Sequence, residues 1–298
     1  MKAEIKIAVV GDIHDQWEAE DRIALEHLGV DLVLFVGDFG NEAIAVVREV
    51  AATTLPFAAV LGNHDAWYTA SPWGRKKPPY DPKKVDRVQE QLDILGEAHV
   101  GYGKRDFPEL GLSVVGGRPF SWGGSEWSSP EFFRDRYNVN GFTESCDRIV
   151  AAAQETSQET LIFLSHNGPY GLGDRPEDIC GRDWEPIGGD RGDLDLTEAI
   201  AKTRHFNKKI PLVTFGHMHQ SLRHTQHQQR QMLQIQGSTF YLNAAQVPRI
   251  INRKNDIRRN FSIVVLQDGE VTKISLVWVG QDYQIISQDI FFPFSLLL

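Results

Sequence analysis

The chain has 298 residues, of which 41% are hydrophobic and 24% charged, a composition typical of a globular protein. Its 31 basic and 40 acidic side chains give a net charge of −9, which argues against a surface that binds duplex nucleic acid. Two cysteines, Cys146 and Cys180, are too few for a disulfide framework and indicate a reducing compartment. The N-terminus does not resemble a signal peptide, and no apolar run approaches the roughly 20 residues that cross a bilayer. We therefore expect a cytoplasmic protein with no transmembrane segment.

The first third of the chain alternates between predicted strands and helices. Apolar runs predict strands at residues 5–10, 32–36 and 57–61, and polar-apolar stretches predict helices at 16–28 and 43–51. This βαβαβ order predicts a parallel sheet covered by helices. A further helix is predicted to start at Asp81 and Pro82, with Asp81 as its N-cap.

The rest of the chain becomes richer in strands. One more helix is predicted at 144–153, and strands are predicted at 112–115, 161–164, 212–215, 232–235, 240–243, 261–266 and 271–279. Asp268-Gly269 marks a hairpin between the last two strands. Because no Pro/Gly/Ser-rich linker divides the sequence, we expect a single α/β domain over residues 1–298.

Three further stretches stand apart from this pattern. Aromatic-rich inserts near residues 67–80 and 118–142 suggest lids or pocket walls, with surface packing as the alternative. The apolar C-terminal run 291–298 is expected to pack on the core or on a partner subunit, which would make an oligomer. An interfacial membrane anchor is the less favoured use of this run.

Polar residues follow five of the predicted strands directly. These segments are Gly11-Asp12-Ile13-His14, Gly37-Asp38, Gly62-Asn63-His64-Asp65, Ser165-His166 and Gly216-His217-Met218-His219. The carboxyl ends of strands in an α/β sheet form the ligand crevice, so these groups should converge there. The glycines would let the backbone turn tightly. If each side chain merely capped a helix or bonded a core carbonyl, the coincidence would have to recur five times in order.

The chemistry of this set indicates metal binding. Imidazoles, carboxylates and one carboxamide, without thiolates, suit Mn, Fe or Zn, whereas Mg matches several histidines less well. Seven candidate ligands are too many for one tetrahedral ion and fit two ions that share a carboxylate. Two ions roughly 3.5–4 Å apart clamp the attacking and leaving oxygens of a displacement at phosphorus. We expect two divalent metal ions, with Mn²⁺ as the first choice and Fe, Zn or Mg as alternatives.

The ordered motifs GDIH, GD, GNHD, SH and GHMH, which span residues 10–219, resemble the calcineurin-like metallophosphoesterase superfamily. The similarity is to its small phosphodiesterase and phosphatase members. It implies an α/β fold, a four-layer αββα sandwich of two mixed β-sheets flanked by helices. The strand-rich tail would then supply much of the second sheet. The aromatic inserts resemble a branch found in photosynthetic organisms, for which the plastid stroma is the alternative location.

The resemblance also implies a role for each motif residue. Asp38 would bridge two ions, and a metal-bridging hydroxide would attack phosphorus in line. The remaining ligands would be Asp12, His14 and His219 for one ion and Asn63, His166 and His217 for the other. His64 would contact the phosphate and protonate the leaving oxygen. Asn41 stands where related enzymes often have an Asp that orients this histidine, and capping of the next helix is its alternative role.

The implied function is metal-dependent hydrolysis of a small phosphate ester or diester. Trp122 and Trp127 are candidates for stacking on a nucleotide-like leaving group, with core packing as the alternative. Arg118, Arg249 and Arg253 are candidates for a second phosphate, although solvation at the surface is the favoured role for any one of them. A phosphoprotein phosphatase is an alternative, disfavoured because residues 37–42 read GDFGNE and lack the arginine of Asp-Arg-Gly. The other alternative is a non-catalytic metal-binding scaffold. Such scaffolds lose motif histidines, which this chain keeps.

Overall fold

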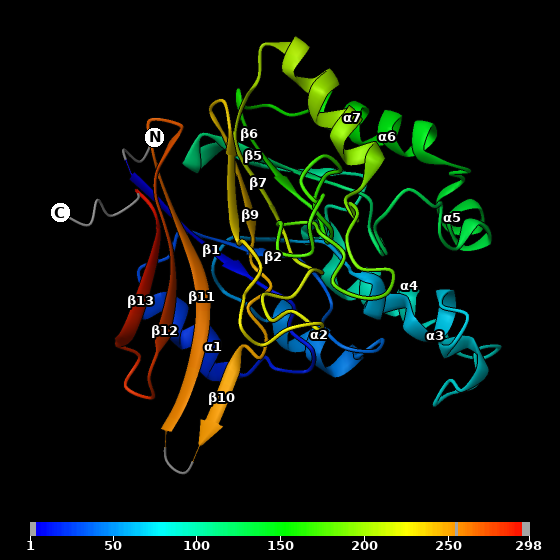
Figure 1. Ribbon diagram of the computed structural model, residues 1–298, viewed down its shortest axis with the longest axis horizontal. Helices are drawn as coiled ribbons and strands as arrows, with labels where there is room; N and C mark the ends of the chain where they lie inside the picture. The colour runs from blue at the N-terminus through cyan, green and yellow to red at the C-terminus, as the bar shows by residue number, and fades with distance from the viewer. Residues whose placement is uncertain (1–3, 254–255, 294–298) are drawn as a thin grey trace.

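The computed structural model describes residues 4–253 and 256–293, which form two β-sheets packed face to face between helices (Figure 1). In this part of the chain the first sheet has seven strands. Its order is β13 (Ile285–Phe292), β12 (Glu270–Val279), β11 (Asp256–Gln267), β1 (Glu4–Val10), β2 (Leu32–Phe35) and β3 (Phe57–Ala59), with β10 (Ile250–Arg253) paired to β11. β1, β2 and β3 run parallel, whereas β10–β13 are antiparallel to their neighbours.

The second sheet contains six strands within the same described ranges. Its order is β4 (Lys104–Phe107), β5 (Leu112–Gly116), β6 (Thr160–Leu164), β7 (Lys209–Phe215), β9 (Thr239–Asn243) and β8 (Leu233–Gln236). The four central strands are parallel, and β4 and β8 close the edges in antiparallel pairs. Both sheets are therefore mixed, as predicted.

Helices cover the outer face of each sheet, which completes the predicted four-layer αββα sandwich. Outside the seven-stranded sheet lie α1 (Ala19–His27), α2 (Ile44–Ala51) and α4 (Arg87–Leu95). Outside the six-stranded sheet lie α6 (Phe142–Gln154) and α7 (Leu194–Thr203). The aromatic inserts contain the short helices α3 (Trp67–Ala70) and α5 (Pro130–Tyr137). None of the helices described is long and apolar enough to span a bilayer.

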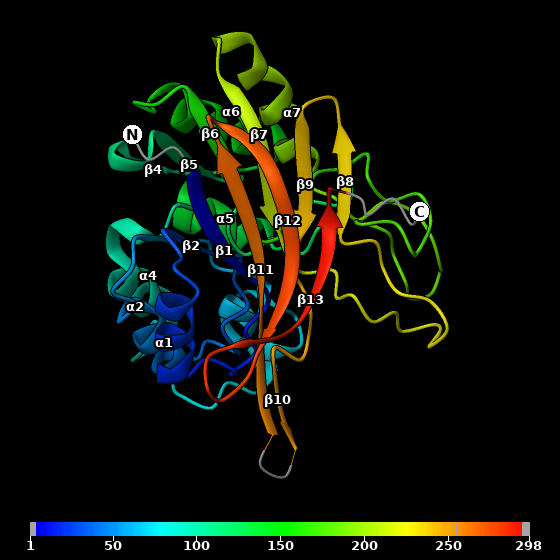
Figure 2. The ribbon, with the colours of Figure 1, turned by 90° about the vertical axis from the view of Figure 1, so that its left-hand side faces the viewer.

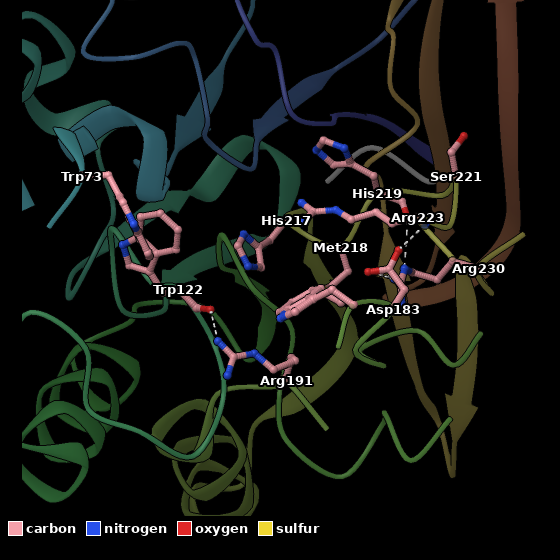
Figure 3. A pocket seen from close by; sticks show the side chains of 11 residues that line it. Trp73, Trp122, Asp183, Arg191, His217, Met218, His219, Ser221, Arg223 and Arg230 are labelled. Atoms are coloured by element: carbon pink, nitrogen blue, oxygen red, sulfur yellow. Dashed lines mark hydrogen bonds and ion pairs between the residues drawn. The ribbon is translucent and has the colours of Figure 1, made fainter. Parts of the chain in front are cut away.

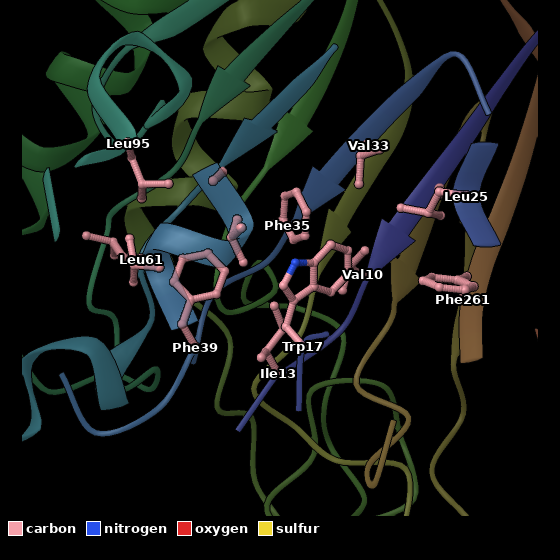
Figure 4. Packing of buried hydrophobic residues seen from close by; sticks show 14 of the residues in the cluster. Val10, Ile13, Trp17, Leu25, Val33, Phe35, Phe39, Leu61, Leu95 and Phe261 are labelled. Carbon is pink, nitrogen blue, oxygen red and sulfur yellow. The ribbon is translucent and has the colours of Figure 1, made fainter. Parts of the chain in front are cut away.

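Alternating side chains of the strands bind the layers together. In β1, Ile7 and Val9 face the second sheet, whereas Ala8 and Val10 face the helices. Both faces are buried, which explains why the run reads as continuously apolar and not as alternating. Figure 4 shows the helix side of this sheet, where Trp17 packs against Phe35 with 5.0 Å between ring centroids.

The helix that was predicted to start at Asp81 and Pro82 is α4, and its predicted start is wrong. α4 begins at Arg87, and the Asp86 carboxylate accepts a hydrogen bond from the Gln89 amide at 2.9 Å. Asp81 instead accepts from the amide of Lys83 at 3.0 Å, closing a local turn. Both aspartates offer capping chemistry, and a turn ahead of the helix uses the first of them.

The C-terminal strands also differ from expectation. β8 and β9 join the second sheet, but β10–β13 extend the first, because β11 pairs with the free edge of β1 (Figure 2). The sequence analysis does not predict β10 or β13. β13 contains apolar residues, among them Ile285, Ile286 and Ile290, but they are exposed and do not alternate strictly with polar ones along the strand. The ring of Phe292 lies 4.7 Å from that of Phe240, so this part of the C-terminal run packs on the core. Residues 294–298 lie outside the described residues.

Candidate active site

The polar residues that follow β1, β2, β3, β6 and β7 meet at the carboxyl ends of these strands. Their ligand atoms form three groups, each within 4.8 Å, which are Asp12, His14 and His219; His14, Asp38 and His64; and Asp38, His166 and His217. His14 and Asp38 belong to two groups each, so the groups form one continuous cluster. Both sheets contribute to it, which places the site across their shared edge.

The surroundings of His166 fit a cation. Its Nδ1–H donates to the Val36 carbonyl at 2.8 Å, so in the neutral ring Nε2 carries a lone pair. That atom lies 2.9 Å from Oδ1 of Asn63, 3.2 Å from Nδ1 of His217 and 3.4 Å from Oδ1 of Asp38. Such a convergence of acceptors suits a metal ion. A bond from the remote ring nitrogen to a carbonyl is the usual way that a ligating histidine is oriented.

A second convergence surrounds Asp12. Nε2 of His219 lies 3.2 Å from Oδ2 of Asp12 and 3.1 Å from Nε2 of His14. Burial alone lowers the pKa of His219, but the hydrogen bond and charge of Asp12 raise it above its usual value. For Asp12 burial acts in the opposite direction and raises the pKa. The hydrogen bond with His219 and the charges of the neighbouring imidazoles outweigh it and bring the pKa of Asp12 below its ordinary range. The nearby imidazoles thus favour the ionised form of this buried carboxylate.

His217, which belongs to the group of Asp38 and His166, is held neutral. Burial and the proximity of His166 keep the pKa of His217 well below its ordinary value. A neutral imidazole presents the lone pair that a metal requires.

The backbone at this edge is strained at three of the candidate ligands. His14, Asp38 and His217 have φ angles of 44°, 51° and 66°, in the left-handed region that residues other than glycine rarely adopt. The amide of His14 donates to the carbonyl of Asp38 at 2.8 Å, and the amide of His217 donates to Oδ1 of Asp12 at 3.0 Å. These bonds hold the loops together, and strain of this kind gathers at functional sites.

Two motif glycines are required by close packing. A Cβ at Gly62 would lie 2.3 Å from Oδ1 of Asp38, and one at Gly216 would lie 2.1 Å from Oδ1 of Asp12. Neither glycine has a left-handed φ angle. Gly62 and Gly216 are therefore needed because another loop lies too close for a side chain, and not for the tight turn that the sequence analysis expected.

Asp65 has a positioning role that the sequence analysis did not assign. Its buried carboxylate accepts hydrogen bonds from the amides of Phe39 at 2.9 Å and Gly62 at 2.7 Å, which joins the loops after β2 and β3. Burial and the charge of Asp38 raise its pKa well above the ordinary value. Its place at the end of the GNHD motif was the available signal.

His64 stands at the edge of the cluster with two neighbours that fix its ring. Its Nδ1 lies 2.7 Å from Oδ1 of Asn41, to which it donates. Its ring stacks on Trp67, with 4.9 Å between centroids and an interplanar angle of 14°. Helix α2 has Ala43 at its N-cap, so the alternative in which Asn41 caps this helix is wrong.

A cavity of about 360 Å³ adjoins the cluster through His217 and His219 (Figure 3). The other residues that line it are Trp73, Trp122, Asp183, Trp184, Arg191, Met218, Ser221, Arg223 and Arg230. Most of them come from loops to which the sequence analysis gave no function, because an isolated arginine or tryptophan in a loop carries no motif.

The two aromatic inserts meet at this cavity. The rings of Trp73 and Trp122 lie 6.0 Å apart, and Trp67 lies 5.7 Å from Trp122. Glu42 fixes the first insert, since its carboxylate accepts from the amide of Thr69 at 2.7 Å and from the hydroxyl of Tyr80.

Other candidates for substrate contact lie elsewhere. Arg118 is 1% exposed, and its guanidinium group bonds Asp193 at 2.7 Å and Asp195 at 2.9 Å. Trp127 does not line the cavity; the Arg118 guanidinium lies 4.8 Å from its ring centroid. Arg249 is also buried and pairs with Asp21 at 3.1 Å. The two arginines are therefore structural, because their charges are already neutralised inside the protein, and Trp127 belongs to the packing around Arg118.

Comparisons with known proteins agree with this architecture. A solved structure aligns with a TM-score of 0.53 and 11% identity, covering 92% of this chain and 98% of that chain. A protein of Thermus thermophilus, TT1561, aligns with a TM-score of 0.50 and 14% identity, covering 96% and 98%. A dimetal phosphatase from Danio rerio aligns with a TM-score of 0.47 and 12% identity, with the same coverages. No curated protein matches the chain.

At such identities the structural likeness concerns the fold alone. The sequence profile of the calcineurin-like phosphoesterases, however, matches residues 5–221, which is more than half of the chain. This range contains all five strand-end motifs that form the ligand cluster. The chain therefore belongs to the calcineurin-like phosphoesterase family.

Proposed function

We propose that the protein is a metal-dependent hydrolase of a small phosphate ester or diester. The observation that carries this proposal is the convergence of Asn63, His217 and Asp38 on Nε2 of His166. Such a set of acceptors, in a member of a phosphoesterase family, is best explained by a cation that works on phosphate.

The proposed ligands follow the grouping of the side chains. Asp38 belongs to both halves of the cluster and would bridge two divalent ions. The other ligands would be Asp12, His14 and His219 on one side and Asn63, His166 and His217 on the other. Mn²⁺ is the first choice for this oxygen and nitrogen set, with Fe, Zn and Mg as alternatives.

Bound ions would polarise the phosphate and supply a nucleophile from water at neutral pH. The residues of the chain divide the remaining work. Nδ1 of His64 donates to Oδ1 of Asn41, so Nε2 faces the leaving oxygen and carries a proton for it only in the imidazolium form of the ring. The amide of His64 donates to Oδ1 of Asp38 at 2.8 Å, and this hydrogen bond fixes the backbone of the proposed acid beside the proposed bridging ligand.

The cavity beside His217 and His219 is the proposed substrate site, and its volume of about 360 Å³ suits a small ester. Of the two tryptophans predicted to contact the substrate, Trp122 lines this cavity and stays a proposed contact. Arg118 and Trp127 are left out, since neither lines the cavity.

The first test is hydrolysis of p-nitrophenyl phosphate and bis-p-nitrophenyl phosphate with Mn²⁺, Fe²⁺, Zn²⁺ or Mg²⁺, alongside elemental analysis of the purified protein. We expect two metal ions per chain and turnover of at least one ester. His166→Ala should abolish this turnover. Metal binding without turnover of either ester would favour the scaffold alternative. A chain that retains no metal would overturn the proposal.

A further inference from the structure

The cavity is lined by both aromatic rings and arginines. Trp73 and Trp122 stand together at one end, and the side chain of Arg223 reaches from the opposite side toward His217 (Figure 3). Trp184 also lines the cavity, and the guanidinium groups of Arg191 and Arg223 lie 5.6 and 5.3 Å from its ring centroid. Aromatic surface and positive charge are thus placed beside the ligand cluster.

Two of the arginines that line the cavity, Arg191 and Arg223, have no ion-pair partner among the described residues. Among the described residues, no carboxylate oxygen lies within 4 Å of the guanidinium group of Arg191 or of Arg223. Asp183 is engaged elsewhere, because its carboxylate accepts from the backbone amide of Arg223 at 2.8 Å and pairs with Arg230 at 3.5 Å. The buried arginines of this chain, by contrast, have acidic partners.

Arg191 is also incompletely bonded. Its Nη2 donates to the carbonyl of Trp122 at 3.0 Å, whereas its Nε is buried without a hydrogen-bond partner. A buried donor without a partner is costly, but Nε of the structural Arg249 is in the same state, so the case for a ligand rests on the unpaired charge of Arg191. The bond to Trp122 also connects the cationic part of the cavity with the aromatic wall.

We propose that this cavity selects phosphate esters that carry a flat aromatic ring and a second anionic group, as a nucleotide with two phosphate groups does. This inference rests on the proposed function, which puts the phosphate to be cleaved beside His217 and His219. The ring would lie against Trp73 and Trp122, and the second anion would accept hydrogen bonds from Arg191 and Arg223. In the reaction a water oxygen bonds to phosphorus as the bond to the leaving oxygen breaks. His64 protonates that oxygen, and the proton lost by water passes to solvent.

The kinetic test compares two chromogenic substrates that differ in one phosphate. These are the p-nitrophenyl ester of thymidine 5′-phosphate and the same ester with a 3′-phosphate. For the wild type we expect KM to be about 10-fold or more lower with the 3′-phosphate, the scale of hydrogen bonds to a charged group. In Arg191→Gln and Arg223→Gln this preference should shrink to about 3-fold or less.

Arg175→Gln is the matched control. Arg175 is an exposed arginine paired with Asp178 at 3.0 Å, and it does not line the cavity. Arg175→Gln removes one positive charge from the chain, as the two cavity variants do. Because this charge does not lie at the cavity, the preference for the 3′-phosphate should stay unchanged. An equal loss in all three variants would mean general electrostatic attraction and would overturn the inference.

A binding test separates this inference from the proposed function. We expect adenosine 5′-(α,β-methylene)diphosphate, which resists hydrolysis at its P–C–P link, to quench tryptophan fluorescence at concentrations about 10-fold or more below adenosine. Arg223→Gln should remove that difference. Binding of this kind without turnover of any ester would support the cavity assignment while the proposed hydrolase function fails. Turnover of bis-p-nitrophenyl phosphate with equal binding of the diphosphate analogue and adenosine would leave the function standing and overturn the inference.

Discussion

The ligand cluster and the cavity beside it are neighbours built in different ways. Cluster residues such as Asp12 and His166 are fully buried at the ends of strands, whereas Trp73 of the cavity wall is 64% exposed and lies in a loop. The cluster is tied by main-chain bonds, for example from the amide of His217 to Asp12. The cavity wall depends on ring contacts and a few side-chain bonds. The sheet edge thus holds the proposed metal ligands, and the loops hold the residues proposed for substrate recognition.

This difference predicts how each region responds to substitution. Changes in the cluster should remove turnover for every substrate, because they affect groups that act on phosphate itself. Changes in the cavity wall should alter KM for particular substrates and leave the chemical step intact.

The largest effect is expected for Asp38→Asn. The amide can still accept the hydrogen bond from the His64 amide, but it lacks the negative charge that two cations would share. Turnover should fall by about 10³-fold or more with every metal, measured as kcat on bis-p-nitrophenyl phosphate. Asp268→Asn, in the turn between β11 and β12, is the control for loss of one carboxylate. Near-normal turnover in Asp38→Asn would exclude the bridging role.

His64→Ala should separate metal binding from proton transfer. We expect two metals per chain by elemental analysis, with a loss of roughly 10²–10⁴ in rate on esters of poor leaving groups. Nitrophenolate leaves without needing a proton, so its esters should lose much less. Equal losses on both kinds of ester would show that His64 mainly contacts the phosphate.

The two tryptophans of the second insert should behave differently from each other. Trp122→Ala removes a cavity wall and should raise KM for a nucleotide-type ester about 5- to 100-fold with little change in Tm. Trp127→Ala removes a ring that packs on Phe133 and Phe142, with centroids 5.0 and 5.1 Å away. It should lower Tm by about 5 °C or more and leave KM unchanged. The reverse pattern would contradict the division between wall and core.

The smallest effect is expected for a histidine outside both regions. Burial lowers the pKa of His99 to about 4, and its Nε2 is sealed from solvent without a hydrogen-bond partner. Between pH 6.5 and 4 the unfolded chain therefore binds a proton that the folded chain does not. The stability that His99 contributes is complete well above pH 6.5 and falls by about 3 kcal/mol as the pH drops to 4.

Urea unfolding over this pH range, in a chelator that removes the metals, would measure the effect. His99→Gln should show a shallower loss of stability toward acid pH than the wild type. Parallel curves for the two proteins would mean that the acid sensitivity comes from other groups, such as the histidines of the cluster.

The sequence by itself determined the strand-end motifs and the layered architecture. Each ligand follows an apolar run, and buried parallel strands bring their carboxyl ends to one edge, so local pattern and fold lead to the same result. The structure brings Asn41 and His64 into contact, as the resemblance to the phosphoesterase family implied. The sequence analysis did not show why Gly62 must be glycine, because the atoms that exclude a side chain there come from Asp38 and His166.

The tertiary structure alone decided which aromatic and basic residues face the cavity. Trp122 and Trp127 are five residues apart in the same insert, yet one lines the cavity and the other packs around Arg118. Arg118 and Arg223 are equally charged in the sequence. Arg118 is neutralised by Asp193 and Asp195, more than 70 residues away along the chain, whereas no carboxylate lies near the guanidinium group of Arg223 in the described part of the chain. Partners so distant in sequence leave no periodic or local signal, so only the folded chain reveals which charge remains available to a ligand.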